Sequence, residues 1–115
     1  AGLEGSIRYK PEAAYQYTER QMALRAWSLA PTLLMNRMAH GRYLDVLVTH
    51  SPPHGIHDGD DLAHRGFATF LDFMDVFKPR SLFHGHKHVY GTEPTRSTYA
   101  ETEVINVYPY RVIAY

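Results

Sequence analysis

The stretch Asp45-Val46-Leu47-Val48-Thr49-His50-Ser51-Pro52-Pro53 decides how this chain is expected to fold. Its apolar triplet is too short for a helix and contains two β-branched residues, which favours a short strand buried on both faces. The strand ends at the polar and proline-rich residues 49–53. In open α/β sheets ligands bind beyond the carboxyl ends of the strands. The sequence therefore places His50 where a ligand site is expected.

The residues before this stretch predict one strand and a broken helix. Residues 3–9 alternate loosely between apolar and polar side chains and are predicted to form a strand. Thr18 and Gln21 fit a capping box, so a helix is expected to begin near Thr18. Pro31 is expected to split the helix into two segments, and Gly41 to end the second.

The residues after it predict a further helix and a set of strands. Together with the upstream elements they indicate an α/β domain whose last strands form a meander. The expected elements are a loop over 54–59, a helix capped by Asp60 or Asp61 that ends at residues 78–79, a strand over 81–84, a polar turn over 92–97, a strand over 103–108 and an edge piece over 110–113.

The composition indicates one domain and excludes several classes of function. The chain has 115 residues, 44% hydrophobic and 21% charged, which predicts a single globular domain over residues 1–115. Twelve basic and twelve acidic residues leave no basic footprint for nucleic acid or for an anionic membrane. The absence of cysteine excludes disulfides and thiolate chemistry. The sequence contains no signal-peptide pattern and no membrane segment, so a cytoplasmic protein is expected. Because the sequence does not start with Met, we also expect that it is part of a longer protein.

Histidine is concentrated in one part of the chain. Seven of the eight histidines lie between His50 and His88. His86 and His88 follow Gly85 and are two residues apart, so in an extended backbone both rings project to the same side and suit one ion or two adjacent ions. For the histidines at positions 54, 57 and 64, in the expected loop and helix start, loop solvation or helix capping is an alternative to a role in chemistry.

These residues together resemble a known family. The chain is similar to the C-terminal half of calcineurin-like metallophosphoesterases, and the stretch over residues 5–9 looks like the strand that follows the family's third metal motif. The resemblance implies the C-terminal half of a four-layer α/β/β/α sandwich, with a mixed sheet and two to three helices. The segments that carry it are Thr49-His50-Ser51-Pro52-Pro53, Gly55-Ile56-His57-Asp58, Ala63-His64-Arg65-Gly66, Phe83-His84-Gly85-His86-Lys87-His88 and Val104-Ile105-Asn106-Val107.

The resemblance implies a metal-dependent phosphoesterase that hydrolyses a phosphomonoester or phosphodiester. In that family two divalent ions, usually manganese, iron or zinc, are bridged by an Asp and by a hydroxide that attacks phosphorus. Carried over to this sequence, His50 and His86 are implied to bind one ion and His88 the other. The resemblance also implies that His57, Asp58 and His64 orient the substrate or support the metal ligands.

The sequence departs from the family upstream. It has no counterpart of the Asp-x-His, Gly-Asp-x-x-Asp or Gly-Asn-His motifs, and its first Asp is Asp45. Neutral imidazoles do not offset the repulsion between two adjacent dications, which are normally held by carboxylates. At most one metal ion is therefore expected on this chain alone, with little or no activity. No catalytic residue is assigned, and the expected partners are the missing N-terminal half or a second copy of the chain.

Two other functions remain open from the sequence. The first is a non-catalytic module that binds a single metal ion, or a partner, through its histidine cluster. The second is a structural domain whose histidines make it sensitive to acid but not to metal.

Overall fold

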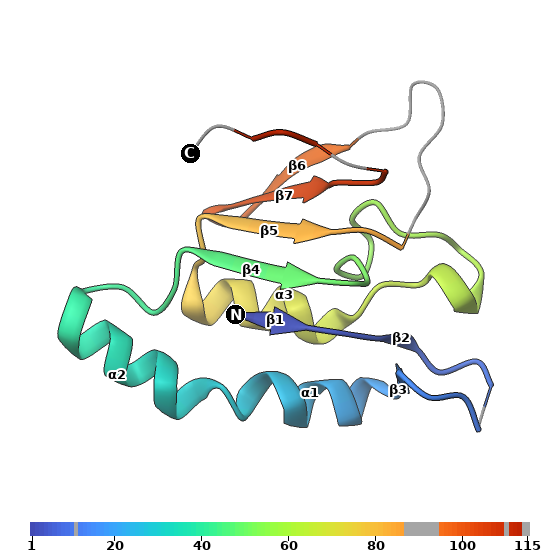
Figure 1. Ribbon diagram of the computed structural model, residues 1–115, viewed down its shortest axis with the longest axis horizontal. Coiled ribbons are helices and arrows are strands. Elements are labelled where there is room, and N and C mark those ends of the chain that lie inside the picture. The colour runs from blue at the N-terminus through green and yellow to red at the C-terminus, as the bar shows by residue number, and fades with distance from the viewer. Residues whose placement is uncertain (11, 87–94, 110, 114–115) are drawn as a thin grey trace.

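The computed structural model describes residues 1–10, 12–86, 95–109 and 111–113, and a mixed β-sheet forms its centre (Figure 1). Among these residues the sheet has five strands, and all pairs are parallel except the pair of the last two. Its spatial order is β1 (Gly2–Leu3), β4 (Val46–Thr49), β5 (Ser81–His84), β7 (Thr102–Asn106) and β6 (Arg96–Tyr99). A separate short pair consists of β2 (Ser6–Ile7) and β3 (Gln16–Tyr17). The predicted α/β class is confirmed.

Helices α1 (Glu19–Trp27) and α2 (Ala30–His40) begin and end as the sequence predicts. The Thr18 side chain accepts from the Gln21 backbone N–H, and the Gln21 side chain accepts from the Thr18 backbone, which completes the capping box. Pro31 lies in the first turn of α2, where its missing N–H costs nothing. Gly41 ends α2 in the left-handed conformation, with φ of 80°.

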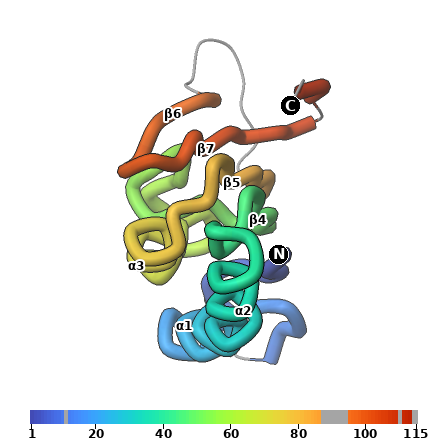
Figure 2. The backbone as a smooth tube through the Cα atoms, turned by 90° about the vertical axis from the view of Figure 1, so that its left-hand side faces the viewer, coloured from blue at the N-terminus to red at the C-terminus, as the bar shows by residue number. Residues whose placement is uncertain are grey.

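The core lies between the sheet and α3 (Ala68–Phe77), which packs against one face of the sheet, while α1 and α2 run along the β1 edge (Figure 2). The Trp27 ring of α1 contacts the rings of Phe73 and Phe77 on α3, with centroids 6.5 and 5.3 Å away. Removing this apolar surface from water is the main stabilising contribution to the fold. The fully buried apolar side chains are Met22, Ala26, Leu47, Phe67, Phe70, Phe73, Met74, Leu82 and Val104.

Strand β4 is buried on one face only. Leu47 is fully buried against the helices, whereas Val48, which points to the other face, is 50% exposed. The expectation of a strand buried on both faces is therefore wrong, because α3 covers a single face of the sheet.

Two other predictions differ from the structure: the strand over residues 3–9 and the start of the helix that was expected to be capped by Asp60 or Asp61. Gly5 adopts a φ of 99° and separates β1 from β2. The Asp61 carboxylate bonds to the His64 ring and does not cap a helix, so the chain makes only a 3-10 turn, η1 (Leu62–His64). Helix α3 begins later, and the carboxylate of Glu19 accepts from the backbone N–H groups of Ala68 and Thr69 in its first turn.

The end of the chain also differs from expectation. The polar turn predicted over 92–97 is wrong at Arg96 and Ser97, which begin strand β6 against β7. Residues 92–94 lie outside the described part of the chain. Strand β7 covers 102–106, close to the predicted 103–108. The expected edge piece over 110–113 is not a strand at its described residues, 111–113.

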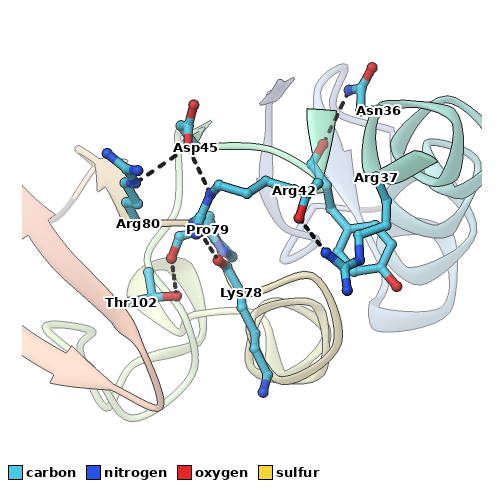
Figure 3. A network of polar contacts seen from close by, with 10 residues as sticks. Asn36, Arg37, Arg42, Asp45, Lys78, Pro79, Arg80 and Thr102 are labelled. Carbon is cyan, nitrogen blue, oxygen red and sulfur yellow. Dashed lines mark hydrogen bonds and ion pairs between the residues drawn. The ribbon is translucent and has the colours of Figure 1, made fainter. Parts of the chain in front are cut away.

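The amino ends of β4, β5 and β7 are joined by a polar network (Figure 3). Arg42 donates to the Asp45 carboxylate at 3.0 Å and to the Lys78 carbonyl at 3.3 Å. The buried Thr102 hydroxyl donates to the Pro79 carbonyl at 2.7 Å. These bonds hold the starts of three parallel strands in place, and therefore also the points at which the strands end.

Candidate metal centre at the carboxyl edge of the sheet

His50 and His86 meet at the carboxyl edge of the sheet. Strands β4 and β5 pair with Thr49 opposite His84, so the segments that follow them leave the sheet side by side. The Gly85 N–H donates to the His50 carbonyl at 3.1 Å. His50 Nε2 and His86 Nδ1 are 2.9 Å apart. The structure thus brings together two of the three predicted ligands.

The third predicted ligand, His88, lies outside the described residues.

A second contact of His86 fixes which of its nitrogens can bind an ion. His86 Nε2 lies 2.6 Å from the carbonyl oxygen of Ala63, so Nε2 carries the proton and donates it there. Nδ1 then carries a lone pair that faces His50 Nε2. Histidines that bind metals usually donate their other ring N–H to a carbonyl or carboxylate in this way.

The spacing of the pair fits two ligands of one ion. Two nitrogens bonded to a single ion at about 2.0–2.1 Å stand about 2.9 Å apart when the bonds meet at a right angle, and about 3.3 Å apart in the tetrahedral geometry usual for zinc. The same distance allows a hydrogen bond from His50 Nε2–H to His86 Nδ1 when no ion is bound. Within the described ranges, no three His, Cys, Asp or Glu side chains converge into a metal-binding group. Two nitrogens alone do not hold an ion, so the pair needs further ligands to make a metal site.

His64 lies next to this pair. Its ring packs on that of His86, with centroids 5.1 Å apart and planes 30° apart. Its Nδ1 contacts the Asp61 carboxylate at 2.8 Å, which orients the ring. The sequence predicted a supporting role for His64 and missed Asp61, because the order of residues suggested a helix cap for that carboxylate.

His57 belongs to a second cluster, with two residues that the sequence analysis missed. His57 Nδ1 lies 3.0 Å from His84 Nε2, and His57 Nε2 lies 2.8 Å from the Ser97 hydroxyl. His84 is fully buried at the end of β5. The alternation of β5 could have revealed this, because it places His84 on the same face as the core residue Leu82, where a polar ring needs partners.

Asp58 shapes the loop between β4 and α3 and does not face the histidine pair. Its Oδ2 accepts from the backbone N–H groups of Gly55 and Gly66, both at 3.0 Å, and lies 3.5 Å from His54 Nδ1. Gly66 fits because a side chain there would collide with the backbone of the two prolines that follow Ser51. Asp58 thus holds the ends of the loop that carries His57.

Burial favours the neutral form of three of these rings, those of His50, His57 and His84. It lowers the pKa of His84 from 6.5 to about 4, although the bond to the Gly85 backbone acts in the opposite direction. Burial and the neighbouring His86 lower the pKa of His50. Burial also lowers the pKa of His57 by more than its bond to the Arg96 backbone raises it. Neutral rings retain the lone pairs that metal binding needs.

A cavity of about 510 Å³ opens beside His50. Arg25 of α1 adds a cationic side chain to its wall, and this guanidinium is held by Glu4 at 3.2 Å and by the Tyr17 ring at 4.2 Å. The cavity is lined by Gly2, Leu3, Glu4, Arg25, Val48, Thr49 and His50. It combines a potential metal ligand with the ion pair of Arg25 and Glu4.

Comparison with known proteins supports the fold and no more. No protein-family model matches the sequence, and no curated protein matches it. The structure is similar to TT1561 of Thermus thermophilus, with a TM-score of 0.56 over 93% of this chain and 42% of that one, at 14% identity. At that identity the likeness shows a shared fold alone. The chain spans about two-fifths of the length of TT1561.

In the described part of the chain, none of the helices has the length and apolar character needed to cross a lipid bilayer.

Proposed function

We propose that this chain is part of a metal-dependent phosphoesterase and that His50 and His86 bind one divalent ion, manganese, iron or zinc. The observation that carries the proposal is the 2.9 Å separation of His50 Nε2 and His86 Nδ1, together with the bond of His86 Nε2 to the Ala63 carbonyl. The motifs shared with calcineurin-like metallophosphoesterases support it. We propose His88 as a further ligand of this ion. We also propose that the protein acts in the cytoplasm.

When bound, a divalent ion supplies Lewis acidity that activates water and polarises a phosphoryl group. The chain's own residues prepare for this. His86 presents an unprotonated Nδ1 because Ala63 holds the proton on the other nitrogen. Arg25 supports the anionic phosphoryl group of a substrate in the cavity beside His50. His64, oriented by Asp61, lies where it can contact that substrate or support His86.

The donor set explains why we expect weak activity from this chain alone. Imidazoles are neutral, so they do not hold two dications close together. We propose that additional polypeptide, in the same protein or as a second chain, supplies carboxylate ligands and covers the face that exposes Val48.

The test is metal binding and phosphoester turnover by the wild type and single variants. We expect the purified chain to bind close to one equivalent of Mn²⁺ or Zn²⁺ in calorimetry, with weak hydrolysis of p-nitrophenyl phosphate or its diester. His50→Ala, His86→Ala and His88→Ala should each weaken binding at least tenfold. The control is His40→Ala, which removes an exposed histidine from the end of α2 and should change neither property.

The outcomes separate the alternatives. No metal binding by the wild type, or equal binding by His86→Ala and His40→Ala, would refute the proposal. Metal binding that is lost in His86→Ala but is never accompanied by turnover would favour the non-catalytic metal-binding module.

A further inference from the structure

A chain of hydrogen bonds connects β6 to the peptide that precedes His86. It starts at the Ser97 hydroxyl, 2.8 Å from His57 Nε2. It continues from His57 Nδ1 to His84 Nε2 over 3.0 Å, and from His84 Nδ1 to the Gly85 carbonyl over 3.1 Å. Three segments that are far apart in the sequence are thus linked: strand β6, the loop after β4, and the end of β5.

The last bond fixes the direction of the bond between His57 and His84. A carbonyl oxygen only accepts, so His84 Nδ1 carries the proton, and in a neutral ring His84 Nε2 must be the acceptor. His57 therefore donates to His84 from Nδ1, while its Nε2 contacts the Ser97 hydroxyl and its ring also bonds to the Arg96 backbone. The tautomer and the orientation of the His84 ring are therefore set by its two contacts, with the Gly85 carbonyl and with His57.

Gly85, at the end of this chain of hydrogen bonds, connects the two candidate ligands His50 and His86. The Gly85 N–H donates to the His50 carbonyl at 3.1 Å, and its carbonyl accepts from His84. The next residue, His86, has a φ of 62°. A residue with a side chain adopts this left-handed conformation at a cost, and it persists only where surrounding contacts hold it. The bonds to Gly85 supply such contacts.

We propose that Ser97 is a positioning residue that sets the place of His86 through His57 and His84. This inference rests on the proposed metal-binding role of His86. Ser97 contacts no ion or substrate in this mechanism. Its hydroxyl fixes the ring of His57, that ring fixes His84, and His84 holds the Gly85 peptide so that the rings of His50 and His86 stay at ligand spacing.

A matched pair of substitutions tests the hydroxyl. Ser97→Thr keeps the O–H, whereas Ser97→Val introduces the shape of threonine without it, and both suit a β-strand. We expect Ser97→Val to weaken Mn²⁺ or Zn²⁺ binding about tenfold or more and Ser97→Thr to stay within about threefold of the wild type. Thr98→Val, at an exposed position on the same strand, is the control and should bind like the wild type. Equal affinities for the Ser97→Val and Ser97→Thr proteins would overturn the proposal.

A measurement on the metal-free wild type keeps the test valid if Ser97→Val does not fold. Long-range ¹H–¹⁵N spectra distinguish protonated from unprotonated ring nitrogens. We expect a protonated Nδ1 and an unprotonated Nε2 for His84, and the opposite tautomer at His84 would overturn the proposal. If the wild type shows this tautomer but binds no metal, the proposed function fails on its own. If it binds metal and the Ser97→Val protein binds equally well, only the role of Ser97 fails.

Discussion

Replacing His84 by glutamine is expected to remove much of the acid sensitivity of the fold. His84 is fully buried, and burial lowers its pKa from 6.5 to about 4. In the unfolded chain the ring is in water and titrates near its usual value. Between these two pKa values the unfolded state binds more protons than the folded state. The free energy of unfolding therefore falls as the pH falls from about 6.5 to about 4.

The size of this effect follows from the two pKa values. At about 1.4 kcal/mol for each pH unit between them, the lowering from 6.5 to about 4 at His84 corresponds to about 3 kcal/mol. All of it is present above pH 6.5, and all of it is lost below pH 4, where both states are protonated. This is a large fraction of the roughly 5–15 kcal/mol that is typical of a folded domain.

The assay is urea unfolding of the metal-free protein in chelator, at intervals between about pH 7.5 and about pH 4. The wild type should lose about 3 kcal/mol more than His84→Gln over this range. His40→Gln removes an exposed histidine from α2 and should follow the wild type. Carboxylates titrate in all three proteins and cancel in the comparison. Parallel curves for the wild type and His84→Gln would refute the reasoning.

Three further substitutions test the fold and the candidate site. Phe73→Ala should lower the free energy of unfolding by about 3–5 kcal/mol in urea titration, because this ring is fully buried. The control is Val76→Ala on the same helix, which should lower the free energy of unfolding far less because Val76 is 48% exposed. Thr18→Ala removes one half of the capping box with Gln21 and should cost about 1 kcal/mol, measured in the same way. Gly66→Ala should weaken Mn²⁺ or Zn²⁺ binding in calorimetry, because its new methyl group would meet the proline carbonyls and displace the loop; unchanged affinity would contradict this.

Elements whose signals are local were predictable from the sequence. The capping box at Thr18, the break at Pro31 and the stop at Gly41 involve neighbouring residues, and the structure confirms all three. The start of α3 was not predictable in the same way. Its first N–H groups are satisfied by Glu19, a residue of another helix that is distant in the sequence, so no local cap marks that start.

Strand β6 was missed for a related reason. Its residues, from Arg96 to Tyr99, are polar or carry hydroxyl groups, and they alternate between exposed and half-buried positions. A sequence of this composition resembles a turn, because neither face is strongly apolar. Pairing with β7 supplies the stability, and that partner cannot be identified from the strand itself.

In the candidate site, the sequence predicted the meeting of His50 and His86 but not the cluster behind them. The first follows from topology, because both residues come after neighbouring parallel strands. The bond between His57 and His84 depends on the path of the intervening loop, in which His57 has a φ of 59°. Such a path is set by tertiary contacts, and no periodicity in the sequence reports it.

Contacts at the amino ends of β4 and β5, far from the histidines, determine whether the histidines meet. The carbonyl of Asp45 accepts from the backbone N–H groups of Arg80 and Ser81, which starts β5 in register beside β4. A slip of one residue along that pair would turn every side chain of β5 to the opposite face. It would move His84 out of the core and take the Gly85 N–H away from the His50 carbonyl. The register that buries the apolar core is therefore the same register that assembles the candidate metal centre, and a change that disturbs one disturbs both.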